Sequence, residues 1–163
     1  MEYTGRREND FTVYAYLEAI LETARVVPAV DQCEHYVGRH PTDSITHAPV
    51  DSKGTIATCR SHNITYMAFS PLGPVGQQPK AVLHNPIVKR VAAAHSVSAA
   101  AIGLAWVQQQ GMVMVTSTDN AAYAKEDLAI DALTLSGAEM AALAVDARVI
   151  HTPLSISHYR LAI

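Results

Sequence analysis

The stretch ITYMAFSPLG, residues 64–73, joins a β-branched and aromatic run to an abrupt ending of serine, proline and glycine. β-Branched and aromatic side chains fit the pleated surface of a sheet, so the first part favours a strand over residues 64–69. Pro71 and Gly73 favour a sharp turn directly after it. The stretch therefore predicts a strand whose carboxyl end is fixed by a turn.

Two shorter apolar runs lie on either side of this stretch and predict neighbouring strands. The first is VVPAV, residues 26–30, and the second is MVMV, residues 112–115. Continuous apolar runs of this length are typical of buried strands in parallel sheets. Proline cannot donate to a strand ladder, so Pro28 is expected near the start of its strand. We expect three parallel strands near 27–32, 64–69 and 112–115, adjacent in that order, with helices on one outer face.

Helical spacing of apolar residues, together with capping signals, predicts helices between and after these strands. Ser136 with Glu139 three residues later forms a capping box, and Pro86 occupies the favoured first helical position. Residues 74–85 predict a long polar loop. Strands that alternate with helices predict a parallel α/β sheet, although three strands are few for a closed eight-stranded barrel. The expected helices span about 13–23, 52–62, 86–94, 98–110, 120–129 and 136–145.

Composition narrows the class of protein and of partner. The chain has 163 residues, of which 49% are hydrophobic and 17% charged, and its formal net charge is −3. Such a balance is typical of a globular domain and predicts no partner among nucleic acids or membrane surfaces. The first ten residues lack the apolar core of a signal peptide, and no run of 18 apolar residues occurs. We therefore expect a cytoplasmic protein.

The cysteines do not form a recognisable metal motif. Cys33 and Cys59 lie outside any C-x-x-C pair, which indicates two reduced, partly buried thiols rather than a disulfide or a zinc site. Cys33, Glu34 and His35 are all metal-ligand residue types, but neighbours along a strand point to opposite faces. No metal site is expected.

Four segments, in this order, resemble the aldo-keto reductase family. VPAVDQCEH at 27–35 is similar to its sixth-strand motif, and ITYMAFSPLG at 64–73 to its seventh. HSVSAAAIGLAW at 95–106 and LTLSGAEM at 133–140 are similar to two later helical motifs. Each is weak alone, but four at plausible spacing over about residues 11–145 make a specific match.

The resemblance implies a partial (β/α)8 TIM barrel, about strands six to eight with their flanking helices. Residues 11–146 would form the C-terminal half of that barrel, after an irregular N-terminus at 1–10 and before a tail at 147–163. It also implies NADPH-dependent reduction of aldehydes and ketones. The family's catalytic aspartate, tyrosine, lysine and histidine come from the first four strand units, which would precede Asp10. No catalytic residue is therefore expected here.

Two functions remain open at this point. One is an aldo-keto reductase chain, truncated relative to the family, whose catalytic half is absent or supplied by another chain. The other is a non-catalytic half-barrel that binds nucleotide or self-associates, because an open half-barrel leaves unpaired strand edges and an uncovered inner face.

The resemblance assigns part of a nicotinamide-nucleotide site to the ends of the strands. Gln32 would hold the carboxamide, although a solvent-facing strand end explains it as well. Phe69 would stack on the nicotinamide, where the alternative is a core phenylalanine. Ser70, Leu72 and the backbone of Gly73 would line the pyrophosphate. Residues Asn9 and Asp10 depart from the serine–asparagine pair of the family, which weakens the carboxamide end.

The far end of the predicted site differs more from the family. Its remaining candidates are the hydroxyl residues Thr116, Ser117 and Thr118 and the carboxylates Glu126 and Asp127. The pair Glu126–Asp127 would hold the adenine amine, or would form a solvated helix face. The hydroxyls and a helix N-terminus would bind an anion, but the lysine and arginine that clamp a 2′-phosphate are replaced, with only Lys125 nearby. We expect weak binding of NADP(H) or NAD(H) with little discrimination.

Overall fold

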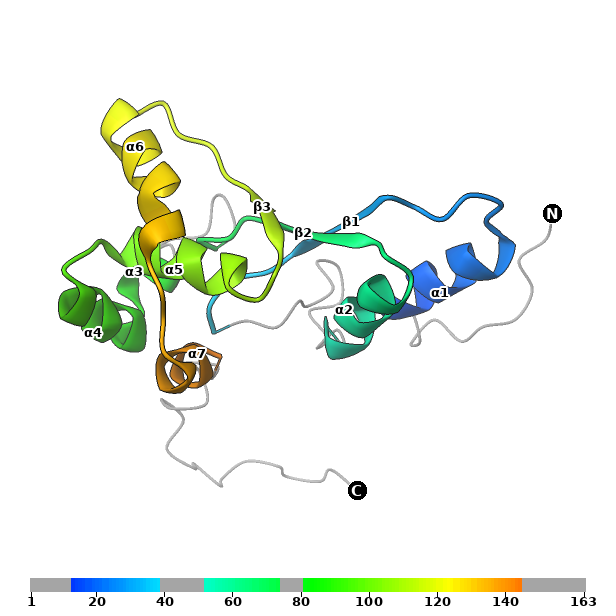
Figure 1. The fold of residues 1–163 in the computed structure, drawn as a ribbon, viewed down its shortest axis with the longest axis horizontal. Coiled ribbons are helices and arrows are strands. Elements are labelled where there is room, and N and C mark those ends of the chain that lie inside the picture. Colours follow the sequence, from blue (N-terminus) through cyan, green and yellow to red (C-terminus); the bar gives the residue numbers. More distant parts are fainter. Residues whose placement is uncertain (1–12, 39–51, 74–80, 145–163) are drawn as a thin grey trace, which may run out of the picture.

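A three-stranded parallel sheet runs through the centre of the molecule (Figure 1). The computed structural model describes residues 13–38, 52–73 and 81–144. The strands are β1 (Val30–Glu34), β2 (Thr65–Phe69) and β3 (Val113–Val115). They lie in the order β1-β2-β3, and both neighbouring pairs are parallel. The predicted strands and their order are confirmed.

The first strand begins three residues later than predicted. Its register pairs Val30 with Thr65 and Glu34 with Phe69, so the ladder includes the polar residues that follow the apolar run. Pro28 stays outside the ladder, in keeping with its lack of an N–H group to donate. Pairing with β2, rather than local hydrophobicity, therefore sets the bounds of β1.

Helices follow the strands close to their predicted positions. Polar side chains start several of them: Asn85 accepts from the N–H groups of Ile87 and Val88, and Ser98 accepts from that of Ala101. The capping box of Ser136 and Glu139 is present. The helices are α1 (Val13–Thr23), α2 (Ser52–Ser61), α3 (Ala81–His84), α4 (Pro86–His95), α5 (Ala99–Gln108), α6 (Ala121–Ala129), the 3-10 turn η1 (Ile130–Ala132) and α7 (Gly137–Leu143).

The short helix α3 corrects the prediction of a loop over 74–85. It places Val82, which is fully buried, against α5 at Gly103. A Cβ atom built on Gly103 would lie 2.7 Å from Val82 Cγ1, so only glycine allows this approach. Packing on α5, and not a local periodic pattern, stabilises a helix this short. Residues 74–80 of the predicted loop lie outside the described residues.

Helix α5 forms the centre of the core. Residues 101–107 of it are all buried, which is expected of a helix that is apolar on every side. Trp106 donates its indole N–H to the carbonyl oxygen of Met140 at 3.2 Å and stacks on His35 with ring centroids 5.1 Å apart. The helix therefore joins α7 to the end of β1. Within the described parts, no single helix is both long and apolar enough to cross a membrane; α4 and α5 reach that limit only as a pair, bent by 95°.

The two faces of the sheet have different surroundings. Cys33, Tyr66 and Ala68 point toward the helices and are buried. The opposite face carries Val30, Gln32, Phe69, Val113 and Val115, all exposed. Among the described residues, helices therefore cover one face only, as predicted. We call the other side the uncovered face.

Candidate functional site

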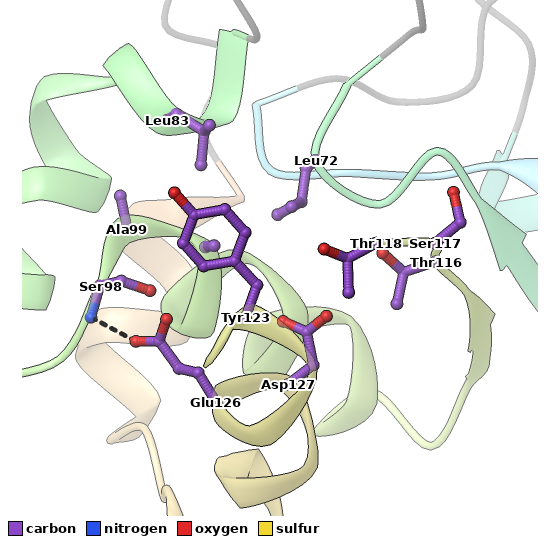
Figure 2. Close-up of a pocket in the computed structure, with 11 residues that line it drawn as sticks. Leu72, Leu83, Ser98, Ala99, Thr116, Ser117, Thr118, Tyr123, Glu126 and Asp127 are labelled. Atoms are coloured by element: carbon purple, nitrogen blue, oxygen red, sulfur yellow. Dashed lines mark hydrogen bonds between the residues drawn. The ribbon is translucent and has the colours of Figure 1, made fainter. Parts of the chain in front are cut away.

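A pocket of about 370 Å³ opens at the carboxyl end of the sheet, between the start of α5, helix α6 and the segment after β3 (Figure 2). It brings together six of the nine residues that the sequence predicts for the nucleotide site, namely Leu72, Thr116, Ser117, Thr118, Glu126 and Asp127. The other lining residues are Leu83, Ser98, Ala99, Ala100 and Tyr123. Ligands of parallel α/β sheets bind at this end of the strands.

Asn120 fixes the start of α6 beside the pocket. Its Oδ1 accepts from the N–H groups of Ala122 at 2.8 Å and Tyr123 at 3.4 Å. Its own N–H group donates to Thr118 Oγ1 at 3.1 Å. The helix N-terminus that the sequence suggests as an anion site is therefore occupied by side chains of the chain itself.

Helix α6 presents three pocket side chains on one surface. Tyr123, Glu126 and Asp127 are spaced i, i+3 and i+4, which places them on the same side of a helix. Glu126 Oε1 accepts from the backbone N–H of Ser98 at 3.2 Å (Figure 2). Glu126 thus ties α6 to the N-terminus of α5, where a negative charge is favourable. It does not form the solvated helix face that the sequence left open.

Asp127 lies on the other side of Tyr123 from Glu126, toward Thr116 and Thr118 (Figure 2). Partial burial, and then repulsion by the neighbouring Glu126, raise the pKa of its carboxyl group above the ordinary value. It accepts no hydrogen bond from the residues that the structure describes, unlike Glu126. A carboxylate in this position favours a ligand that donates hydrogen bonds to it.

The turn after β2 carries the pocket's inner wall. Ser70 adopts a left-handed backbone with φ of 50°, and Gly73 has φ of 102°. The N–H of Gly73 donates to the carbonyl oxygen of Ser70 at 2.8 Å, which closes the turn. Leu72 points into the pocket from this turn (Figure 2), whereas Ser70 and Phe69 do not line it. The conformation that the sequence predicts for the stretch is confirmed.

Gln32 and Phe69 lie on the uncovered face instead. Gln32 donates its amide N–H to Met67 Sδ at 3.3 Å across the β1–β2 pair. Phe69 is 39% exposed and pairs in register with Val115, one residue before the hydroxyl segment. The alternative that Phe69 is a core residue is wrong. The predicted site is thus divided between the pocket and the adjoining edge of the uncovered face.

Known proteins related to this chain share its sequence over most of its length. It is 33% identical over 137 residues to aldo/keto reductase slr0942 of Synechocystis sp., an alignment covering 79% of this chain and 38% of the relative. It is 32% identical over 126 residues to NADPH-dependent codeinone reductase 1-1 of Papaver somniferum, covering 76% of this chain and 36% of that protein. This chain is homologous to the aldo-keto reductases. No family model matches it.

The solved structures show the same fold. MGS-M4, an aldo-keto reductase enzyme from a Medee basin deep-sea metagenome library, matches with a TM-score of 0.66 at 20% identity, over 91% of this chain and 50% of that one. The three-stranded sheet and its helices thus have the fold of part of a (β/α)8 barrel, as predicted. The chain spans 38% and 36% of the lengths of these two curated relatives.

Sequence reasoning missed several pocket residues of this aldo-keto reductase homologue. Tyr123 shares a helix surface with Glu126 and Asp127, and its spacing was a usable signal. Leu83 had none, because it lies on the helix that replaces a predicted loop. Ser98, Ala99 and Ala100 line the pocket from the start of α5.

A cluster beneath the sheet does not join this site. The thiols of Cys33 and Cys59 both donate to Asp31 Oδ2 at 3.6 Å. Burial, and then the charge of Asp31, raise the pKa of each thiol to about 12. Burial likewise raises the pKa of Tyr66 far above its ordinary value. Within the described ranges, no three His, Cys, Asp or Glu side chains form a group that could hold a metal.

Proposed function

We propose that this chain is the nucleotide-binding part of an NAD(P)H-dependent carbonyl (aldehyde or ketone) oxidoreductase of the aldo-keto reductase family. One observation carries the proposal: six residues that the resemblance assigns to the cofactor site come from three separate segments and line one pocket. The related codeinone reductase is NADPH-dependent by its name. A reduced nicotinamide supplies the hydride that carbonyl reduction requires.

The residues present fit a dinucleotide in two parts. The pocket combines the aromatic ring of Tyr123 with hydroxyl and carboxylate groups, which suits an adenosine. The turn at Ser70–Gly73 lies between the pocket and the uncovered face. Phe69 and Gln32 on that face offer an exposed ring and an amide, which suits the nicotinamide and its carboxamide.

The finer part of this proposal is that the 163-residue chain does not reduce carbonyls alone. A proton donor for that reaction needs a pKa near the working pH. Tyr66 is buried beneath the sheet, and burial raises its pKa, further from the working pH. With purified chain, NADPH and an activated aldehyde, we expect no loss of reduced-nicotinamide absorbance above background. Turnover near the ~10 s⁻¹ median of enzymes would refute this part.

Binding is the direct test of the proposed function. Calorimetric titration of the full chain with NADPH and with NADH should show saturable binding. Tyr123→Ala should weaken it by about 1–3 kcal/mol, the range for stacking of a base on an aromatic ring. Leu128→Ala is the matched control, because Leu128 is on the same helix, 80% exposed, and outside the pocket lining. Equal weakening in both variants, or no binding of either nucleotide, would contradict the proposal.

The uncovered face supports self-association as a second function. Val30, Phe69, Val113 and Val115 are 44%, 39%, 45% and 47% exposed on adjacent strands. Exposed apolar side chains on one face of a sheet favour an association surface. Val113→Lys should convert any oligomer to monomer in sedimentation velocity, whereas Leu128→Lys should not. A wild-type chain that stays monomeric at high concentration would exclude this function.

A further inference from the structure

The charge of the pocket determines which nucleotide it accepts. Two carboxylates, Glu126 and Asp127, line it, and the described lining includes no lysine, arginine or histidine. Lys125 lies between Tyr123 and Glu126 in the sequence but does not line the pocket. A phosphate group placed here would face negative charge without a cation to balance it.

Several backbone donors beside the pocket already have acceptors within the chain. Helix N-termini bind phosphate through N–H groups that have no partner within the helix. At the start of α6 the N–H groups of Ala122 and Tyr123 already donate to Asn120, and that of Asn120 donates to Thr118. At the start of α5 the Ser98 N–H donates to Glu126. Four backbone N–H groups at the two helix ends beside the pocket are therefore engaged before any ligand arrives.

Asp127 is placed to accept hydrogen bonds from a ribose instead. Glu126 already accepts from Ser98, whereas Asp127 has no such donor among the described residues and faces the hydroxyl segment (Figure 2). A carboxylate accepts hydrogen bonds from ribose hydroxyls, and it repels the same position once it carries a phosphate. The Tyr123 ring beside it offers an apolar surface for the purine.

We propose that this pocket binds the adenosine of a nucleotide whose 2′-hydroxyl is not phosphorylated, and that Asp127 sets this specificity. The inference rests on the proposed nucleotide site and departs from the NADPH dependence in the name of the codeinone reductase relative. It also replaces the sequence-based expectation of little discrimination. NAD(H) would then be preferred to NADP(H).

Two small ligands test the adenosine end without the nicotinamide. Calorimetry of the full chain with AMP and with adenosine 2′,5′-bisphosphate, at one pH and one salt concentration, should show about tenfold or more tighter binding of AMP. Asp127→Asn removes the charge with little change in shape, so it should bring the two affinities together. Glu22→Gln removes one charge from α1, at the opposite end of the molecule (Figure 1), and should leave the preference unchanged.

The outcomes separate this inference from the proposed function. If none of AMP, NADH and NADPH binds, both this inference and the proposed function are refuted. Equal affinities in the wild-type chain, or tighter binding of the bisphosphate, would overturn the inference and leave the proposed function standing. A preference for AMP that Asp127→Asn and Glu22→Gln reduce equally would also overturn it, because net charge and not the pocket would then be the cause.

Discussion

Substitution of Gly103 by alanine tests the closest packing contact in the fold. The added Cβ would lie 2.7 Å from Val82 Cγ1 and 3.0 Å from Leu72 Cδ2. Separations below 3.0 Å are too short for carbon atoms, so α3 or the Val82 side chain has to move. Leu72 is half-buried and more adaptable, but it forms the inner wall of the pocket. The substitution therefore affects both stability and the site.

Two opposing effects decide the size of the change. Replacing glycine by alanine inside a helix gains about 0.8–1 kcal/mol from helix propensity. Overpacking a filled core by one methyl group costs about 1–3 kcal/mol. Val82 is fully buried and its side chain is short, so we place the cost in the middle of that range. The expected result is a net loss of about 1 kcal/mol in the free energy of unfolding.

Gly137→Ala is the control for helix propensity. A Cβ built on Gly137, at the start of α7, meets nothing within 4 Å, so this variant should be neutral or slightly more stable. Urea unfolding can be followed by the fluorescence of the single tryptophan, Trp106, which is buried. The difference between the variants should be about 1–2 kcal/mol. If Gly103→Ala is as stable as Gly137→Ala, the packing argument is wrong.

Three further predictions concern backbone strain, acid stability and thiol reactivity. Gly111→Ala should lose about 1–2 kcal/mol in urea unfolding, because φ is 76° there, although the added Cβ meets nothing within 4 Å; unchanged stability would rule out strain at this position. Hydrogen bonds from Ser136, and then His95, hold the pKa of Glu139 at about 2, below its ordinary 4.5. This stabilisation is complete above pH 4.5 and is lost as the pH falls toward 2, so Glu139→Gln should flatten the acid side of the melting-temperature profile; parallel profiles would contradict this reasoning. The two cysteines beneath the sheet, with pKa values of about 12, should resist alkylation at neutral pH until the chain is unfolded, and rapid labelling of native protein would show that they are accessible.

Local signals in the sequence predict those elements whose bounds are set locally. The turn after β2 follows from Pro71 and Gly73, and the capping box of α7 follows from Ser136 and Glu139. The bounds of β1 do not, because pairing with β2 extends the ladder into polar residues as far as Glu34. In each confirmed case, a few neighbouring side chains carry the whole signal.

In the site too, local motifs predict some residues, and long-range packing determines the others. The resemblance finds Leu72, the hydroxyl segment and the carboxylates of α6, because these residues lie in recognisable motifs. It finds neither Leu83, which depends on the packing of α3 against Gly103, nor the engagement of Asn120 with three backbone or side-chain partners. Whether a helix end is open to a ligand depends on rotamers that a sequence pattern does not specify. The specificity inferred for Asp127 rests on the charge of the pocket lining and, in part, on that engagement.

The cap at Asn120 also means that a ligand need not order the first turn of α6. Because the first turn of α6 is hydrogen-bonded internally, its amide protons should exchange slowly with solvent even without nucleotide. A ligand entering a preformed wall loses little affinity to conformational entropy. The nucleotide would then bind to a preorganised surface, without folding of α6 upon binding. The heat-capacity change of binding should reflect only the surface buried by the nucleotide.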